Sequence, residues 1–400
     1  MKRFKYKAMK SDGSKVEGEY ESYSKDLVLS MITSNGYYPL RIEEIVESKK
    51  IEFKFRKKVK LKDLSVFCRQ LYTMLDAGIS ITNALNILRN QLYNYSLKDA
   101  ISQIEADVKK GEMLSDAMKK HGDIFPNLVT SMVESGEVSG NLDEMMLRLS
   151  VNYEKENRIN KKVVSAMIYP IILSIVAVLA VMIIMIFVMP IFIQIFNDMD
   201  VKLPIVTKAL LAVSGFLQRD IIFILLIIMA LIGGFIYYKQ TEKGMWFVSK
   251  AKLKMPIIGK LSKKIIVSRF TRTLSTLMAS GVSLIQALPI VGAVLGNKVA
   301  EEAIATIRER VARGEGLSDP IKRIEIFPPM LPSMIKIGEE AGSLDDILNK
   351  TADFYDEEVE EAIQNVTALI EPLLIIVMGV VIGFIVAAIM LPMVDMYSAM

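Results

Sequence analysis

The chain has 400 residues, of which 52% are hydrophobic and 24% charged, so it holds enough apolar material for several cores or for a membrane, and intrinsic disorder is excluded. Its single cysteine and single histidine, Cys68 and His121, exclude a disulfide and a Cys/His zinc site. The formal net charge of +4 is too balanced for a chain whose main task is to hold a nucleic-acid backbone, so no directly bound nucleic acid is expected.

Residues 1–48 predict a small accessory α+β module. Polar and apolar residues alternate over 4–8, a turn signal stands at Asp12-Gly13, and a second extended run lies near 16–20. A short helical stretch follows from 24 to 34. Alternation, turn and second extended run together are typical of a β-hairpin, with a helix packed beside it.

Residues 49–62 form a basic linker with eight basic residues and one acid. Three apolar side chains, Ile51, Phe53 and Phe55, are interleaved with these charges. A segment of this composition is suited to lie on anionic lipid headgroups. A solvated linker has the same composition, so both interpretations stay open.

Three later segments contain no charged side chain: 163–197, 221–238 and 372–394. A helix needs roughly 20 apolar residues to cross the hydrocarbon core, and these segments meet or nearly meet that length. They predict transmembrane helices over 163–194, 220–238 and 370–394. The second is the shortest, and a buried core helix is the alternative for it.

Basic residues are concentrated before the first of these helices and after the second. Because Lys and Arg are retained on the cytoplasmic side of short connections, the loop 195–219, with only three basic residues, is expected outside. We expect an amphipathic helix in that loop. The connection 239–263 is then a basic cytoplasmic segment. The flanks of the third helix are uninformative, and alternation alone places the tail 395–400 outside.

The two polar halves of the chain repeat each other at an offset of about 203 residues. The matching segments are 67–78 with 270–281, 111–116 with 314–319, and, after a one-residue deletion, 136–143 with 338–345. Each repeat is a soluble unit, 63–162 or 264–368, followed by one membrane helix. The unmatched second membrane helix places both units on the cytoplasmic face, in agreement with the charge argument.

Within each unit the apolar residues recur at intervals of three and four, as in Leu64, Phe67, Leu71 and Met74. That spacing is helical, and each unit is predicted to be an antiparallel helical bundle. The expected fold class is therefore mostly α: a polytopic membrane protein with two homologous cytoplasmic bundles, three transmembrane helices and the small N-terminal α+β module.

Most of the repeated residues fit turn geometry. The repeated glycines are predicted as turn positions: Gly78, Gly281, Gly136, Gly338, Gly140 and Gly342. Ser80 and Ser283 suit helix N-caps, and 141–144 and 343–346 resemble capping boxes. Four repeated charges are not required by such caps, and we expect them at surfaces that contact the other bundle or a partner: Arg69, Arg272, Glu137 and Glu339.

No catalytic chemistry is recognisable in the sequence. It lacks a Gly-rich phosphate loop and the motifs HExxH, CxxC and Gly-x-Ser-x-Gly. No ionisable residue lies deep in the apolar segments, which argues against a pump. We expect no catalytic residue, cofactor or metal site, and no enzyme. For the acidic run 353–361 a cation site and a solvated helix face both remain open.

The third membrane helix carries small residues four apart: Gly379, Gly383 and Ala387. Such a strip permits close backbone approach between helices in a membrane. It is expected to pack either on another membrane helix of the same chain or on the same helix of a second copy. The first alternative carries no concentration cost.

The order and doubling of these motifs resemble the F-protein family of type II secretion, the polytopic inner-membrane platform proteins of type II secretion and type IV pilus assembly. The resemblance rests on the opening segment 4–8 with Asp12-Gly13 and Gly18, on the doubled Phe-x-Arg-x-Leu-x-Thr and Gly-Glu-x-x-Gly-x-Leu-Asp motifs, and on the external segment 203–211.

This resemblance implies a platform on which a cytoplasmic hexameric assembly ATPase acts to extract and polymerise pilin-like subunits. The implied partners are that ATPase, pilin or pseudopilin subunits, other inner-membrane assembly proteins, membrane lipid and further copies of the chain in a homo-oligomer. The implied location is the bacterial inner membrane, with the N-terminus cytoplasmic and the C-terminus external. Secretion, pilus building and DNA uptake are equally compatible with it.

Two other functions remain as alternatives. A transporter or permease built from parallel repeats would need polar groups at the membrane midplane, and the apolar segments lack them. A static membrane scaffold for signalling partners is compatible with the residues, and loss of ATPase-dependent fibres or secretion in a deletion strain would separate it from a platform.

Overall fold

The computed structural model describes residues 2–44, 58–198 and 205–399. The chain forms two compact units, Met1–Arg56 and Lys57–Met400. Most of the predicted basic linker, at 49–57, lies outside the described residues.

The N-terminal unit is a three-stranded antiparallel sheet with one helix. Its elements are β1 (Lys2–Met9), β2 (Lys15–Ser22), α1 (Lys25–Ser34) and β3 (Tyr38–Glu44), with strand order β2-β1-β3. Gly13 has a φ of +82° in the hairpin turn, which favours glycine. Phe4 and Ala8 pack against Val28 and Ile32 of the helix. The predicted α+β module is confirmed, and β3 is a strand that the alternation pattern missed.

The second unit contains two helical bundles built alike. The first consists of α2 (Leu61–Asp76), α3 (Ile81–Gln91), α4 (Tyr95–Lys109), α5 (Leu114–Lys119), α6 (Asn127–Ser139) and the start of α7 (Leu142–Ile183). The second consists of α12 (Ile258–Ala279), α13 (Leu284–Val294), α14 (Lys298–Ala312), α15 (Ser318–Lys322), α16 (Met330–Ala341) and the start of α17 (Leu344–Ala399).

The same ring contact stands in the core of each bundle. The ring centroids of Phe67 and Phe125 lie 5.6 Å apart, and those of the equivalent Phe270 and Phe327 lie 5.3 Å apart. All four side chains are buried. The sequence repeat is therefore a repeat of packing.

Two long helices leave the bundles. At about 1.5 Å per residue, the 42 residues of α7 extend roughly 63 Å, about twice the hydrocarbon thickness of a bilayer. α7 continues through a short π-helical segment, η1 (Ile184–Val188), into α8 (Met189–Asp198). Among the described residues two helical stretches are long and apolar enough to cross a membrane, Leu142–Phe192 and Leu344–Leu391.

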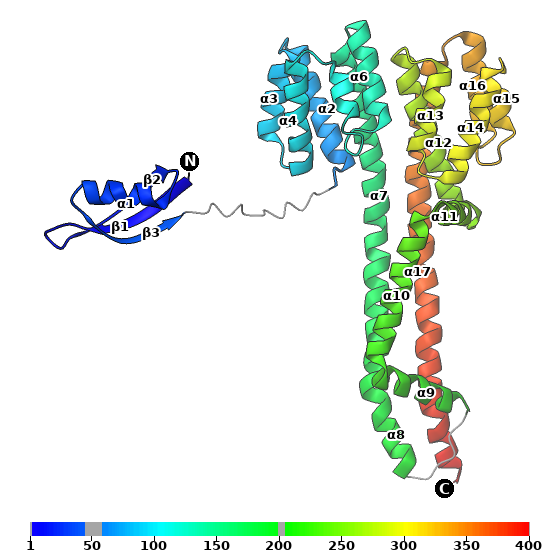
Figure 1. Ribbon diagram of the computed structural model, residues 1–400. Helices are drawn as coiled ribbons and strands as arrows, with labels where there is room; N and C mark the ends of the chain where they lie inside the picture. Colours follow the sequence, from blue (N-terminus) through cyan, green and yellow to red (C-terminus); the bar gives the residue numbers. More distant parts are fainter. Residues whose placement is uncertain (1, 45–57, 199–204, 400) are drawn as a thin grey trace. The chain divides into compact units, whose positions relative to one another are not determined.

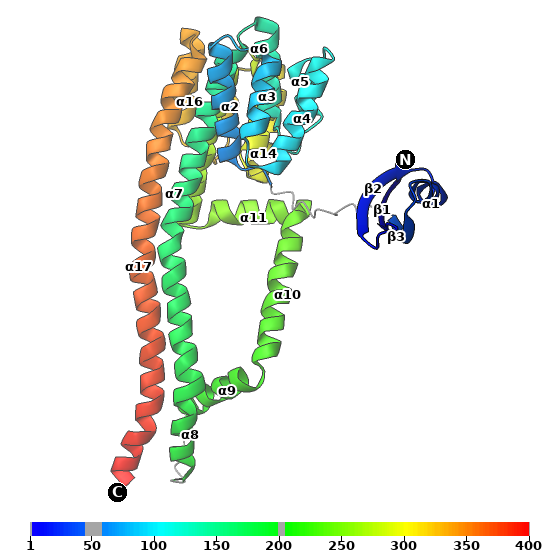
Figure 2. The same ribbon diagram turned by 90° about the vertical axis from the view of Figure 1, so that its left-hand side faces the viewer.

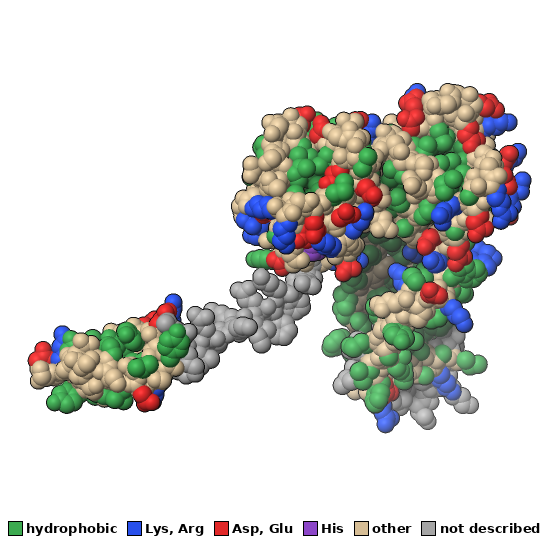
Figure 3. All heavy atoms as spheres, turned by 45° about the horizontal axis from the view of Figure 1, so that its top comes forward, with side chains coloured by type: hydrophobic (Ala, Val, Ile, Leu, Met, Phe, Trp, Pro, Cys, Tyr) green, Lys and Arg blue, Asp and Glu red, His purple; other side chains and the backbone are tan. Residues whose placement is uncertain are grey.

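α7 and α17 lie side by side, and both bundles lie at the same end of them (Figures 1 and 2). Three helices connect the halves: α9 (Ile205–Arg219), α10 (Ile221–Gln240) and α11 (Glu242–Lys254). The predicted second membrane helix coincides with α10, and its place in a membrane stays a prediction. Charged side chains of both signs cover the bundles, and hydrophobic side chains dominate the helices beyond them (Figure 3).

The repeated glycines have two different roles. Gly78, Gly281, Gly140 and Gly342 end helices with φ between +66° and +79°, as the turn interpretation requires. Gly136 and Gly338 were predicted as turn positions as well, and that prediction is wrong, because both lie inside helices. A Cβ on Gly136 would lie 2.8 Å from Cγ of Met145 on α7, so this glycine permits two helices to approach closely.

The predicted caps are only partly present. Ser80 and Ser283 stand at the N-cap positions of α3 and α13 with extended backbone, but neither side chain makes a capping hydrogen bond. The capping box predicted at Asn141 is not formed, since its side chain makes no capping hydrogen bond.

The small-residue strip of α17 lies away from the other described helices. Nothing described lies within 4 Å of a Cβ placed on Gly379 or Gly383, and Ala387 is exposed. α17 packs instead through Ile385 and Ala388, against η1, α8 and α9. The described structure thus does not place the strip on another helix of the same chain.

Candidate functional site: the junction between the repeats

Helix α7 of the first repeat packs along α12 and α17 of the second. We call the charged residues at this contact the junction: Lys155, Glu156, Arg158 and Lys162 on α7, Arg269 and Arg272 on α12, and Asp353, Asp356 and Glu360 on α17. The junction stands where the bundles meet the two long helices, so it is one of the places where the repeats are joined.

Ion pairs connect α7 directly to α17. Lys155 pairs with Asp353, and Lys162 pairs with Glu360. Arg158 also reaches Glu360, at 3.4 Å. Exposed pairs of this kind each contribute little to stability, so their main effect is to set the register of the two helices.

An apolar contact lies beside these charges. Ile159 of α7 packs with Val359 and Ile363 of α17, and Leu261 and Ile265 of α12 complete the cluster. Because the cluster involves all three helices, it supplies the desolvated packing that the surface ion pairs lack.

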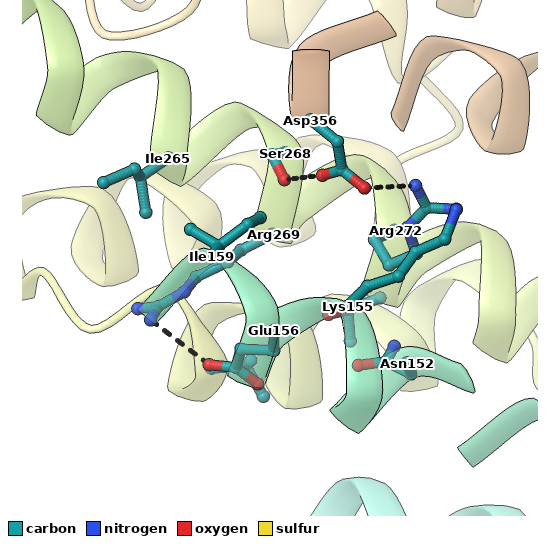
Figure 4. Close-up of a pocket in the computed structure, with 11 residues that line it drawn as sticks. Asn152, Lys155, Glu156, Ile159, Ile265, Ser268, Arg269, Arg272 and Asp356 are labelled. Carbon is teal, nitrogen blue, oxygen red and sulfur yellow. Dashed lines mark hydrogen bonds and ion pairs between the residues drawn. The ribbon is translucent and has the colours of Figure 1, made fainter. Parts of the chain in front are cut away.

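Glu156 and Arg269 form the most enclosed ion pair between the repeats, at 3.2 Å (Figure 4). Their side chains are only 16% and 21% exposed. Burial raises the pKa of Glu156, and the positive charge of Arg269 offsets this only in part. Arg269 also donates to the carbonyl of Leu295 and to Oδ1 of Asn160, so it is held from both repeats.

Arg272, one of the predicted contact residues, is buried within the second repeat. It donates to Asp353 at 2.7 Å, to Asp356 at 2.6 Å and to Asn349 at 3.0 Å, which ties α12 to α17. Ser268 donates to the other oxygen of Asp356 (Figure 4). Asp353 is shared between Arg272 and Lys155, and through it Arg272 is connected to the first repeat.

The shared carboxylate is kept ionised. Burial alone would raise the pKa of Asp353, but the hydrogen bonds from Lys155 and Arg272 outweigh it and hold that pKa below its ordinary value. Asp353 therefore keeps its negative charge at neutral pH and binds both cations.

Arg69 makes the equivalent contact in the first repeat, with Glu154 of α7 at 3.1 Å. Glu154 corresponds to Asp356 once the one-residue deletion is counted. This pair is largely exposed, whereas Arg272 is buried. The equivalent arginines thus differ in exposure, because α7 of the first repeat packs against α12 and α17 of the second repeat.

Glu137 and Glu339 cap short helices. The carboxylate of Glu137 accepts from the backbone N–H groups of Leu114, at 2.5 Å, and Ser115, at 2.9 Å, at the start of α5. Glu339 accepts from Leu317 and Ser318 in the same way at α15. A carboxylate here satisfies unpaired donors and favours the positive end of a helix. The premise that no cap requires these charges is therefore wrong, and a role in partner contacts stays a prediction.

The acidic run 353–361 is largely neutralised by bases. Asp353, Asp356 and Glu360 belong to the junction, and Glu358 pairs with Lys264. Among the residues that the structure describes, no group of three or more potential ligand side chains is arranged to hold a metal ion. Four of its six acids thus serve as ion-pair partners of bases on α7 and α12, while Glu357 and Glu361 are exposed.

The one cysteine is unsuited to act as a nucleophile. Cys68 is fully buried in the core of the first bundle, and burial raises the pKa of its thiol to about 12. A thiol with this pKa stays protonated at neutral pH.

Arg272 belongs to a repeated motif, but the pair of Glu156 and Arg269 could not be predicted from the motifs, because these residues lie 113 residues apart and neither belongs to a motif. One signal was present. Arg269 stands where the first repeat has Val66, so the two repeats differ in charge at this position of the helix.

Comparisons with known proteins agree with the repeat. The family model described as type II secretion system protein F matches residues 67–190 and again 270–392, and the model of its N-terminal domain matches 1–43. The type IV pilus assembly protein PilC of Thermus thermophilus is 37% identical, over 98% of this chain and 97% of that protein. The PilC of Myxococcus xanthus is 34% identical, over 99% and 95%. The type II secretion system protein F of Aeromonas hydrophila is 34% identical, over 94% and 98%.

Proposed function

The chain belongs to the type II secretion system protein F family, and from that premise we propose that it couples a cytoplasmic assembly ATPase to the extraction and polymerisation of pilin-like subunits. Its role in secretion or pilus assembly is that of a platform, since relatives matched along nearly their whole length are named for those two processes.

The observation that carries the coupling is the continuity of α7 and α17 with the bundles. Each helix begins in a bundle core and continues without a helix end into an apolar stretch long enough for a membrane. The junction joins the two helices where they leave the bundles. A displacement of either bundle would therefore be passed to both long helices together.

The free energy for this displacement is proposed to come from the partner ATPase, because the sequence has no phosphate-binding loop. The other proposed partners are pilin or pseudopilin subunits and further inner-membrane assembly proteins. We assign no catalytic residue and no cofactor to the platform itself.

The proposed topology has three membrane helices, within 163–194, 220–238 and 370–394. The N-terminus and both bundles are cytoplasmic, and the loop 195–219 and the C-terminus are external. The basic flanks support this arrangement, as does the position of both bundles at one end of α7 and α17.

Cysteine labelling in intact cells tests the topology. A membrane-impermeant maleimide is expected to label a Lys208→Cys variant and to leave a Lys322→Cys variant unlabelled until the cells are opened. Both side chains are exposed, and the buried Cys68 with its raised pKa gives little background. Labelling of Lys322→Cys in intact cells would refute the proposed topology.

A deletion strain tests the coupling. Loss of the chain is expected to abolish fibres or secreted product, and the full chain is expected to co-purify with the assembly ATPase from membranes. Reversal of Lys162 to Glu should reduce output, and adding Glu360→Lys should restore it by re-forming the pair. Normal assembly without the chain, or an ATPase that never co-purifies, would contradict the proposal.

A further inference from the structure

We propose that α11, with the groove beside it between α12 and α17, binds anionic phospholipid at the cytoplasmic boundary of the membrane. The proposal rests on the membrane placement given above for residues 220–238 and 370–394, and it is independent of any ATPase. Four observations carry it: the exposed face of α11, the corner before it, the groove after it and the local charge.

One face of α11 presents a basic stripe with an aromatic residue in it. Lys243, Phe247, Lys250 and Lys254 follow one another at helical spacing of four, three and four, and all are exposed. Phe247 is 60% exposed. Lys250 lies over the ring of Trp246, with its Nζ 4.3 Å from the ring centroid.

The opposite face of α11 is fixed to the second bundle. Ser249 is buried; its carbonyl accepts from Asn297 at 3.2 Å, and its hydroxyl oxygen accepts from the backbone N–H of Lys298 at 3.1 Å. Trp246, which lies between this face and the basic stripe, donates from Nε1 to Glu302 at 3.2 Å. Because this face is anchored, the basic stripe points away from the bundle and cannot turn inward.

A tight corner directs α11 across the end of α10 (Figure 2). Oγ1 of Thr241 donates to the carbonyl of Tyr238 and accepts from the N–H of Gly244. A Cβ on Gly244 would lie 1.8 Å from that carbonyl oxygen, so only glycine allows the corner. Tyr237 and Tyr238 are exposed at the end of the apolar helix, where aromatic residues are typical of a membrane boundary.

A groove follows where α12 begins, next to α17 just before its most apolar stretch. Ile257 and Leu261 line one side, and Val366 and Leu369 line the other. Lys260 and Lys264 also line it, and it holds about 640 Å³ including its open mouth. Lys264 pairs with Glu358, whereas Lys260 has no ion-pair partner among the described residues.

The charge of this region selects the kind of lipid. Residues 239–264 contain eight lysines and one acid, Glu242. Lysines near a membrane surface attract anionic headgroups, and a basic pocket beside a membrane helix is suited to hold one. An apolar lining next to a free lysine fits an acyl chain with a phosphate above it. A purely protein partner would not require exposed aromatic residues at the end of an apolar helix.

The chain offers a selective probe, because Trp246 on α11 is its single tryptophan. Full-length protein is reconstituted in vesicles of neutral phosphatidylcholine that contain a fixed fraction of brominated phosphatidylglycerol or brominated phosphatidylcholine. Bromine quenches tryptophan only at short range. We expect brominated phosphatidylglycerol to be enriched about fivefold around Trp246, the ratio that corresponds to the attraction of one lysine to an anionic surface.

Two variants and a control complete the experiment. The triple change Lys243→Glu, Lys250→Glu and Lys254→Glu should abolish the preference, and Lys260→Glu alone should reduce it. Lys322→Glu, the same change at an exposed position on α15, should leave it intact. Circular dichroism and gel filtration establish that each variant is folded.

Equal quenching by the two lipids in the parent protein, or a preference that survives in both lysine variants, would overturn the proposal. Failure of the platform function is a different result, because it is measured as fibre or secretion output. If neither lipid quenches Trp246, α11 does not lie at a membrane and the proposal is equally refuted.

Discussion

Glu156 on α7 and Arg269 on α12 form an ion pair of 3.2 Å that joins the two sequence repeats, and both side chains are largely shielded from water. The pair belongs to no repeated motif. It forms only because one repeat packs against the other. The change in the free energy of unfolding when the pair is broken therefore reports on the contact between the two repeats.

Replacing Arg269 by Ala is expected to destabilise the protein, since Glu156 would be left buried without its partner. Breaking a buried pair on one side costs roughly 3 to 5 kcal/mol, and the partial exposure of this pair places the effect at the lower end. Chemical denaturation of the full chain in detergent measures it. The double variant Arg269→Met, Glu156→Leu is the control and should recover much of the loss; no recovery would show that the charges themselves are needed.

The pH dependence of stability should differ in sign at the two junction carboxylates. The pKa of Glu156 is raised, so the native state holds the proton more tightly, and stability falls as the pH rises from 4.5 through the folded pKa. Glu156→Gln should remove that decline. The pKa of Asp353 is lowered, so its contribution is present above 3.8 and is lost as the pH falls through the folded pKa.

Denaturation of the parent, Glu156→Gln and Asp353→Asn across acidic to neutral pH checks these signs. Asp353→Asn should be less stable than the parent at neutral pH, with a difference that shrinks on acidification. A difference that grows on acidification would contradict the assignment of Asp353 as an ionised partner of Arg272 and Lys155.

Substitution of Glu137 distinguishes a structural role as a helix cap from a role in contact with a partner. Glu137→Gln should lower stability by about 1 kcal/mol, because a charged acceptor of two backbone N–H groups at α5 is lost. Glu134→Gln, at an exposed position one turn earlier, is the matched control and should change stability by less than about 0.5 kcal/mol. Unchanged stability in Glu137→Gln together with lost ATPase co-purification would instead support the contact role.

The exposed strip on α17 predicts association between copies of the chain. Single-cysteine variants at Val380 and Phe384 are expected to cross-link as dimers in membranes, and Gly383→Ile should abolish the bands by removing close backbone approach, at a cost of roughly 1 to 2 kcal/mol. The same substitution at Leu373, an exposed bulky position on α17, is the control. If the parent variants yield no dimer, the strip is not an interface between copies.

Local patterns were sufficient for much of the architecture. The 203-residue repeat, the helical spacing around Phe67 and Phe270, and the charge-free segments predicted two alike bundles and the apolar portions of α7 and α17. Gly78 and Gly140 have positive φ, in agreement with the predicted turns, because glycine adopts the left-handed conformation without a steric cost. The helical spacing, the charge-free segments and the helix-ending glycines depend on neighbours within a few residues, and the repeat is visible by comparing the two halves of the sequence.

What only the tertiary structure decided involves residues distant along the chain. Glu137 caps a helix that begins 23 residues earlier, Gly136 is small because Met145 of the next helix packs on it, and Glu156 meets Arg269 across 113 residues. No periodicity relates these partners, so the sequence pattern predicted a turn at Gly136 and a surface contact at Glu137, and it assigned no role to Glu156 or Arg269. The repeat predicted two similar bundles, but only the packing of α7 over α12 and α17 makes them unequal, burying Arg272 while its equivalent Arg69 stays exposed.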